Sequence, residues 1–396
     1  MLIGAVDSSE VSPRPSGLDE LDRVLGGGVV PGSVTLVGGE PGVGKSTLLL
    51  QVVAAWPGRA LYVSAEESAQ QVRLRADRLG AVRDDLWLAA EMSLHRIIAA
   101  IDDLSPELVI IDSVQTIADS DIASAPGTVV QVRECAHRLV QEAKRRNIAI
   151  VLVGHVTKEG GLAGPRVLEH VVDTVLAFEG DRHHALRMLR ATKHRFGPTD
   201  ELGLFEMSDG GLRGVPDASQ LFLADRHAGT PGSVVVPTME GHRPLLVELQ
   251  SLVSSSTLAQ PRRSAQGLDQ GRLSMLLAVL EQRAALSLAK YDVFTSVVGG
   301  IKLAEPGVDL AICLAVASAL TNRPLPSGLA ACGEVGLGGE IRQVSQTSRR
   351  LTEAARLGQT TVLCPPSAPN GIPGLKIQRV ATLSEALAAA GLRGRG

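Results

Sequence analysis

GEPGVGKS, residues 39–46, lies between an apolar run that predicts a strand (residues 34–38) and STLLLQVV (residues 46–53), which predicts a helix. The spacing G-x-x-x-x-G-K-S is typical of a P-loop, whose glycines let backbone N–H groups turn toward a nucleotide phosphate. A plain glycine-rich turn is the alternative, and the strand–loop–helix context disfavours it. We therefore expect ATP and Mg²⁺ to bind here, with Lys45 opposite the β- and γ-phosphates and the Ser46 hydroxyl on Mg²⁺. The predicted cofactor-binding residues of this loop are Gly39, Glu40, Pro41, Gly42, Val43, Gly44, Lys45, Ser46 and Thr47.

The segments around this loop alternate between strand-like and helix-like patterns. Short apolar runs typical of strands occur at residues 60–64, 86–89, 108–111, 148–153 and 171–178. Helix-period stretches at residues 70–79 and 129–146 lie between some of them. Strands that alternate with helices indicate an α/β domain with a mostly parallel sheet that is covered on both faces.

Acidic residues lie at or directly after the ends of two predicted strands. Asp112 ends LVIID, and a carboxylate at a strand end beside a P-loop can hold Mg²⁺ through water. A helix N-cap is the alternative for Asp112. Glu66 and Glu67 follow ALYVSA, which we expect to be the strand next to the P-loop strand. Glu66 is predicted to be the catalytic base that deprotonates the attacking water, and Glu67 to interact with a helix dipole. The alternative is that either Glu is simply a first-turn helix residue that the dipole favours.

Polar and basic residues follow the next predicted strand. His155, in VLVGHVTKEGG, is placed to sense a γ-phosphate and is a candidate catalytic residue. Lys158 and Arg166 belong to the glycine-rich segment beyond it and are predicted to contact the phosphate backbone of DNA, independently of base sequence. An ordinary loop explains this composition equally well.

LRMLRATKHRFG, residues 186–197, concentrates positive charge. In an extended segment Lys193 and Arg195 lie on the same side, because side chains alternate with a period of two. We expect these two cations to neutralise γ-phosphate charge in a neighbouring subunit, as arginine fingers do. A solvated strand face is the alternative.

Length and composition limit the remaining possibilities. The chain has 396 residues, which favours two domains, and its 42 acidic and 39 basic residues exclude a generally basic nucleic-acid coat protein. Hydrophobic residues make up 44%, so the chain is not largely disordered. It contains neither an apolar run of membrane-spanning length nor a signal-peptide pattern, and its four cysteines are far apart. A cytoplasmic protein without membrane contact is expected.

The texture of the sequence changes after about residue 214. Residues 251–270 are rich in Ser and Gln and predict an exposed linker or loop. Helical patterns follow at residues 273–288, 308–320 and 384–390, so the second unit is expected to be α+β. The expected organisation is a flexible leader (1–13), an ATPase domain (14–215), a connecting segment (216–233) and a second domain (234–396).

Taken together, these motifs resemble the RadA (Sms) family of bacterial DNA repair proteins, and KHRFG is the most specific part. The resemblance implies a RecA-like ATPase core followed by a Lon-protease-like domain. It also implies a hexameric ring motor that hydrolyses ATP, binds single-stranded and branched DNA, drives branch migration and works with the recombinase RecA. Lys45 and Ser46 match the family's Walker A positions and Asp112 its Walker B position. Residues 193–197 match KNRFG, with His194 in place of Asn.

The chain departs from the family pattern at its start. Family members usually begin with a four-cysteine zinc finger, and the first residues here correspond to the segment just after it. Zinc is therefore not predicted. The alternatives to a DNA motor are an ATP-dependent protease or protein-remodelling factor, and a nucleotide-switch scaffold without enzymatic activity.

The second domain lacks the residues that Lon-type proteolysis needs, a Ser nucleophile and an activating Lys. The matching segment, EPGVDLAICLAVASAL, has Gly307 where the Ser would be, and GLGGEIRQV has no Lys. Ring assembly and DNA contact are the expected roles of this domain. The candidate phosphate contacts are Lys302, Arg342, Arg349 and Arg350.

Overall fold

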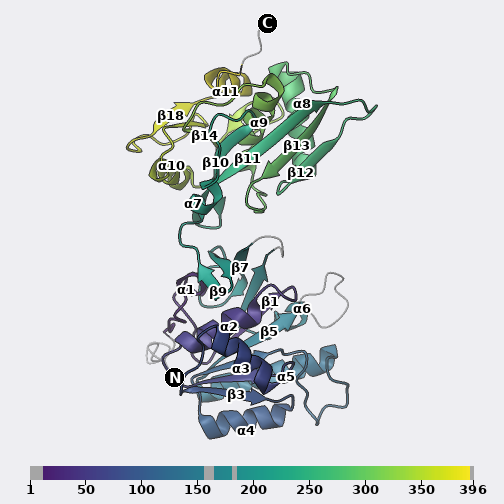
Figure 1. The fold of residues 1–396 in the computed structure, drawn as a ribbon, viewed down its shortest axis with the longest axis vertical. Coiled ribbons are helices and arrows are strands. Elements are labelled where there is room, and N and C mark those ends of the chain that lie inside the picture. The colour runs from purple at the N-terminus through teal and green to yellow at the C-terminus, as the bar shows by residue number, and fades with distance from the viewer. Residues whose placement is uncertain (1–11, 156–164, 181–184, 393–396) are drawn as a thin grey trace, which may run out of the picture. The chain divides into compact units, whose positions relative to one another are not determined.

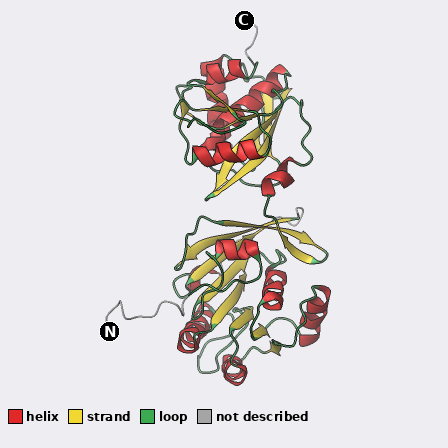
Figure 2. Ribbon diagram, turned by 90° about the vertical axis from the view of Figure 1, so that its left-hand side faces the viewer, coloured by secondary structure: helices red, strands yellow, loops and turns green. Residues whose placement is uncertain are grey.

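The computed structural model describes residues 12–155, 165–180 and 185–392, which divide into two compact units, Met1–Pro216 and Asp217–Gly396 (Figure 1). In each unit the strands form a central sheet that is flanked by helices (Figure 2). The predicted α/β class with a mostly parallel sheet in the first unit, and a second sheet domain after it, are both confirmed.

The first unit is built on a nine-stranded sheet in the order β3-β2-β4-β5-β1-β6-β7-β8-β9. Strands β1 to β6 run parallel, whereas β7, β8 and β9 are antiparallel to their neighbours. The strands are β1 (Val34–Gly39), β2 (Ala60–Ser64), β3 (Leu86–Ala90), β4 (Leu108–Asp112), β5 (Ala149–His155), β6 (Thr174–Glu179), β7 (Leu186–His194), β8 (Leu202–Ser208) and β9 (Gly211–Gly214). The helices are α1 (Asp19–Val24), α2 (Lys45–Ala55), α3 (Ala69–Arg78), α4 (Leu94–Leu104), α5 (Val129–Arg146) and α6 (Pro165–Leu168).

Helices cover both faces of this sheet. One apolar core contains residues of α1, α2 and α3, and the other contains residues of α4 and α5. Because both faces are covered, β1, β2 and β4 are buried at every position and read as continuous apolar runs rather than alternating ones.

Local sequence accounts for the limits of α5. The Thr128 side chain accepts a hydrogen bond from the backbone N–H of Gln131 and caps the start, while Asn147 adopts a left-handed conformation (φ +55°) and ends it. Basic residues occupy the last turn, where the helix dipole favours them. The buried apolar residues recur at helical spacing: Val132, Cys135, Ala136, Leu139, Val140 and Ala143.

The strand order corrects one expectation about the site. The strand before Glu66, β2, is not the neighbour of the P-loop strand β1, because β4 and β5 lie between them. Asp112, at the end of β4, is separated from β1 by β5 alone. His155, at the end of β5, pairs in register with Gly39 of β1.

The second unit has a seven-stranded mixed sheet in the order β12-β13-β11-β10-β14-β17-β18, with a separate β15–β16 ribbon. Helix α9 is buried along most of its length in the middle of the unit. The strands are β10 (Ser233–Glu240), β11 (Arg243–Ser255), β12 (Arg263–Gln266), β13 (Tyr291–Val297), β14 (Leu329–Ala331), β15 (Glu334–Val335), β16 (Ile341–Arg342), β17 (Thr361–Cys364) and β18 (Lys376–Arg379). The helices are α7 (Ala218–Leu223), α8 (Gln270–Ala284), the 3-10 helix η3 (Pro306–Val308), α9 (Asp309–Thr321), α10 (Thr347–Arg356) and α11 (Leu383–Ala389).

Two segments that the sequence predicts to connect other elements contain a helix or strands of their own. The segment 216–233 contains α7, whose buried Ser219 hydroxyl accepts from the Leu246 N–H and donates to Glu353. The expectation of a loop over residues 251–270 is wrong in part, because β11 continues to Ser255 and β12 occupies Arg263–Gln266. The end of β11 contains three serines, of which Ser254 and Ser255 are exposed, whereas Ser251 is buried and its hydroxyl lies 3.0 Å from that of Thr295.

None of the helices in the described part of the chain combines the length and the apolar character that crossing a bilayer requires.

The cysteines give a test of the fold. Cys135, Cys313, Cys332 and Cys364 are buried, and burial raises the pKa of Cys135 and Cys364 to about 11 and that of Cys332 to about 12. Because the thiolate is the reactive form, we expect the folded protein to react with a thiol reagent at pH 8 at least ~100-fold more slowly than the urea-unfolded protein. A thiol that reacts rapidly in the folded protein, measured by absorbance, would contradict this packing.

Candidate nucleotide-binding site

The P-loop connects β1 to α2 along a path that requires glycine at two positions. Gly44 has φ +115°, and a Cβ there would lie 2.6 Å from the Met207 side chain. A Cβ on Gly39 would lie 2.4 Å from the backbone oxygen of Phe178. Because the positive φ of Gly44 disfavours other residues and Gly39 has no room for a side chain beside the Phe178 backbone, the loop presents backbone at the start of α2, where helix N–H groups favour an anion.

The Lys45 side chain reaches back to the P-loop that precedes it in the sequence. Its ammonium donates to the backbone oxygens of Gly39 (2.9 Å) and Glu40 (3.0 Å), and its side chain is buried. Burial lowers the pKa of Lys45 below its ordinary value, an effect that the carboxylates of Asp112 and Glu66 partly offset. A buried cation held on neutral carbonyls is suited to phosphate oxygens, which carry the opposite charge.

Asp112 is fixed at the end of β4 by a partner that sequence analysis missed. The Tyr62 hydroxyl donates to Asp112 Oδ2 at 2.6 Å, and both side chains are buried. Burial and the nearby Asp112 charge raise the pKa of Tyr62 well above its ordinary value, so its hydroxyl stays a neutral donor. Ser46 lies in the first turn of α2 and is half-buried. A carboxylate and a hydroxyl are oxygen ligands that suit Mg²⁺.

Glu66 lies beside two other polar groups of the predicted site. Its Oε1 accepts a short hydrogen bond from the Ser113 hydroxyl and lies 3.2 Å from His155 Nε2. The structure thus brings together Glu66 and His155, which are 89 residues apart. Glu67 is not in the first turn of α3: it precedes the N-cap Ser68, and its carboxylate pairs with Arg75 at 2.5 Å.

Lys193 and Arg195 lie at the end of the strands opposite to the end that carries the P-loop. Thr35 of β1 pairs with Thr174 of β6, which pairs with His194 of β7, whereas Gly39 pairs with Phe178. Four residue steps separate these rows, or about 13 Å along the strands.

Both cations contact the segment between α6 and β6. Lys193 Nζ donates to the backbone oxygens of Glu169 (2.6 Å) and Val172 (2.8 Å). Arg195 Nη1 donates to Asp173 at 3.2 Å. Within one chain these side chains are therefore directed away from the P-loop end of the sheet.

The residues predicted to contact DNA differ in their exposure and in how much of them the structure describes. Lys158 lies outside the described residues, and of Arg166 the structure describes only the backbone, in α6. Lys302, Arg342 and Arg349 are exposed. The expectation for Arg350 is wrong, because its side chain is fully buried and its guanidinium pairs with Glu305.

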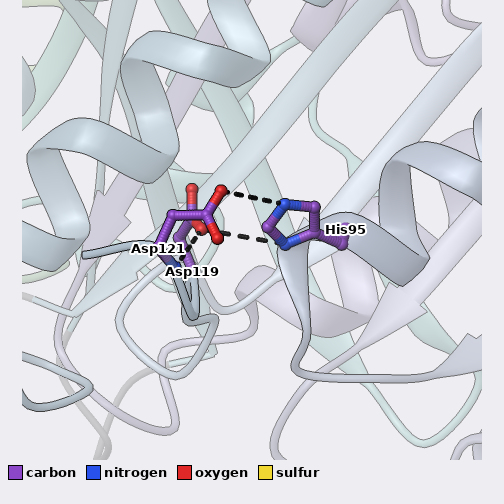
Figure 3. A group of neighbouring side chains, drawn as sticks. All are labelled: His95, Asp119 and Asp121. Carbon is purple, nitrogen blue, oxygen red and sulfur yellow. Dashed lines mark hydrogen bonds and ion pairs between the residues drawn. The ribbon is translucent and has the colours of Figure 1, made fainter. Parts of the chain in front are cut away.

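His95, Asp119 and Asp121 form a second polar cluster (Figure 3). His95 of α4 lies 3.7 Å from Asp119 and 3.3 Å from Asp121, both in the loop between β4 and α5. The potential ligand atoms of these three residues lie close enough together to hold a metal ion. However, Arg138 of α5 already lies 2.6 Å from Asp119 Oδ2 and 3.6 Å from Asp121. Arg138 therefore forms ion pairs with both carboxylates, and the polar contacts of the cluster tie this loop to α4 and α5.

The sheet, the glycine loop, the buried lysine and the acidic strand end define a P-loop ATPase of the RecA-like class. In agreement, residues 8–161 match a family model described as an AAA domain. The chain is 50% identical over 390 residues to the DNA repair protein RadA of Mycobacterium tuberculosis H37Rv, covering 97% of this chain and 81% of that protein. It is 49% identical over 391 residues to RadA of Bacillus subtilis 168, covering 97% and 85%. The chain therefore belongs to the RadA family of DNA repair proteins, as the motifs predicted.

A solved structure resembles part of the chain. A KaiC-like protein from Pyrococcus horikoshii OT3 aligns with 52% of this chain and all of its own, with 19% sequence identity and a TM-score of 0.44.

The site gives a direct prediction for Lys45. Replacing it (Lys45→Ala) removes the buried cation, so we expect at least ~100-fold weaker binding of ATP, since a charge-assisted contact to phosphate contributes about 3 kcal/mol. Binding of a fluorescent ATP analogue with Mg²⁺ measures this. The matched control is Lys144→Ala, on the exposed side of α5, and an equal loss in both variants would show that the site is misassigned.

Proposed function

We propose that the protein is a DNA-dependent ATPase that works as a ring-shaped motor in homologous recombination, where it binds single-stranded and branched DNA and drives branch migration. The observation that carries this proposal is the position of Lys193 and Arg195. They belong to the family's most specific motif, yet they lie at the strand ends opposite the P-loop of their own chain.

ATP hydrolysis would take place at the P-loop. Ser46 and Asp112 would hold Mg²⁺, which neutralises charge on the β- and γ-phosphates when bound. Lys45 would move from the carbonyls of Gly39 and Glu40 to phosphate oxygens. Glu66 would accept the proton of the attacking water as its oxygen bonds to the γ-phosphorus and the bond to ADP breaks, while Ser113 and His155 orient the carboxylate.

Assembly would bring the cations of one copy to the P-loop of another. Because β7 runs antiparallel to β6, the end that carries Lys193 and Arg195 is far from the loop of the same chain. These cations can reach a γ-phosphate if a second copy presents its P-loop to them. A closed ring, which we propose to be a hexamer, supplies that arrangement at every site. In it Arg195, 53% exposed, would exchange Asp173 for phosphate.

DNA binding would be mainly electrostatic. Aromatic residues make up 2% of the chain, so base stacking contributes little and electrostatic contacts to phosphates dominate. We propose Lys158 and Arg166 in the first unit, and Lys302, Arg342 and Arg349 in the second, as such contacts. DNA binding should then weaken steeply with salt. Cytoplasmic location and cooperation with the recombinase RecA belong to the same proposal.

The geometry of the second unit gives the protease alternative no support. Gly307 occupies the position of the nucleophile, and a Cβ there would lie 3.0 Å from Arg350 Nη1 and 3.1 Å from Glu305 Oε2. A buried ion pair thus surrounds the place where Lon-type chemistry needs a serine hydroxyl. We propose a structural and DNA-binding role for this unit.

One experiment tests the proposed function as a whole. The ATPase rate is measured against added single-stranded DNA, and the mass of the assembly is determined in the same buffer. We expect DNA to accelerate hydrolysis in a species of several subunits. A rate that DNA does not change, or ATP-dependent degradation of casein, would contradict the proposal.

Mixing variants tests whether the site is shared between subunits. Lys45→Ala and Lys193→Ala proteins should each be inactive, because one lacks the P-loop cation and the other the cation from the neighbour. In a mixed ring, a Lys193→Ala P-loop can meet an intact Lys193 from a Lys45→Ala neighbour. We therefore expect ATPase activity to return on mixing, to about a quarter of wild type if subunits assemble at random.

The controls for this mixture are each variant re-assembled with itself, which should stay inactive. A Lys193→Ala protein that hydrolyses ATP at the wild-type rate would rule out the neighbour's contribution from this residue.

A further inference from the structure

A buried arginine from β7 reaches the P-loop. Arg187 is 6% exposed, and its Nε donates a hydrogen bond of 2.9 Å to the backbone oxygen of Val43. Its Nη1 also donates to the oxygen of Leu186. The basic run of residues 186–197 contains Arg187, but none of the roles described above uses it.

The bond to Val43 fixes the peptide group that follows it. A trans peptide is planar, so its C=O and N–H point in opposite directions. Because the Val43 oxygen is turned toward Arg187, the N–H of Gly44 is turned away from it. Gly44 is the N-cap of α2, with φ +115°, and its backbone has the freedom that this orientation requires.

We propose that Arg187 is a positioning residue of the nucleotide site: it holds the Val43–Gly44 peptide so that the Gly44 N–H faces the bound phosphate. The inference deepens the proposed ATP hydrolysis at the P-loop and is independent of ring formation and DNA. A guanidinium is suited to this role because it stays charged and offers several donors in a fixed plane.

Gly180 leaves the space through which the Arg187 side chain passes. A Cβ on Gly180 would lie 2.3 Å from Arg187 Cδ and 3.0 Å from its Nε. The atoms that would have to move belong mainly to a flexible side chain. Gly180→Ala should therefore displace the guanidinium from Val43 without removing its charge and with little change to the fold.

Equilibrium binding of a fluorescent ADP analogue with Mg²⁺ to the full chain tests the inference. We expect Arg187→Gln to weaken binding about 10-fold, because one charge-assisted hydrogen bond to the loop is lost. Arg187→Lys keeps the charge but not the planar donor and should recover part of the affinity. Gly180→Ala should weaken binding about 3- to 10-fold. In steady state, KM for ATP should rise more than kcat falls, since the contact acts on the bound phosphates before and during reaction.

Two matched controls separate this role from general packing. Gly210→Ala lies in the β8–β9 turn, where the nearest atom to a new Cβ is 3.9 Å away, and Arg213→Gln removes an exposed arginine of β9. Both should bind nucleotide like the wild type. If Arg187→Gln does not fold, the nucleotide affinity of Gly180→Ala alone tests the inference.

Wild-type nucleotide affinity in Gly180→Ala, or a lower melting temperature of unliganded Arg187→Gln with unchanged nucleotide affinity, would overturn the inference. A wild-type protein that binds nucleotide but is not accelerated by DNA would contradict the motor proposal instead, and the comparison of affinities would still decide the role of Arg187.

Discussion

The buried ammonium of Lys45 is the interaction on which the rest of the site depends. A cation in the interior is tolerated only with partners, and here two loop carbonyls supply them. They are in reach because Gly39 and Gly44, without side chains, let the loop fold tightly between β1 and α2. The two acidic groups that most affect Lys45, Asp112 and Glu66, come from strands farther along the sheet. The nucleotide site is therefore a property of the whole sheet and not of the loop alone.

Strand direction places the charged residues of the first unit at the two opposite ends of its strands. The parallel strands β1, β4 and β5 place Gly39, Asp112 and His155 at one end. The antiparallel β7 carries Arg187 near that end and terminates, at the other, in the segment with Lys193. One strand thus joins the P-loop of its own chain to the cations that we propose for a neighbour. In the ring that we propose, β7 would therefore link two neighbouring nucleotide sites.

Much of the fold follows from the sequence, but the order of the strands does not. The P-loop, the buried strands and α5 have local signals: glycine spacing, apolar runs and helical periodicity. Local patterns cannot reveal that β4 and β5 separate β1 from β2, because crossover connections pass over neighbouring strands. The same reason explains Tyr62, which reads as an apolar strand residue, and Arg350, whose partner Glu305 lies 45 residues away. The Ser-rich end of β11 reads as a linker because local composition reveals neither that Ser251 is buried nor that the strand continues to Ser255.

We propose that each active site is completed by a second copy of the chain. The most direct measurement is the ATPase rate per subunit over a dilution series, with the mass of the species determined at each concentration. The account predicts that activity per subunit falls together with the fraction of assembled protein and vanishes for the single subunit. A rate per subunit that stays constant when the assembly has dissociated would contradict it.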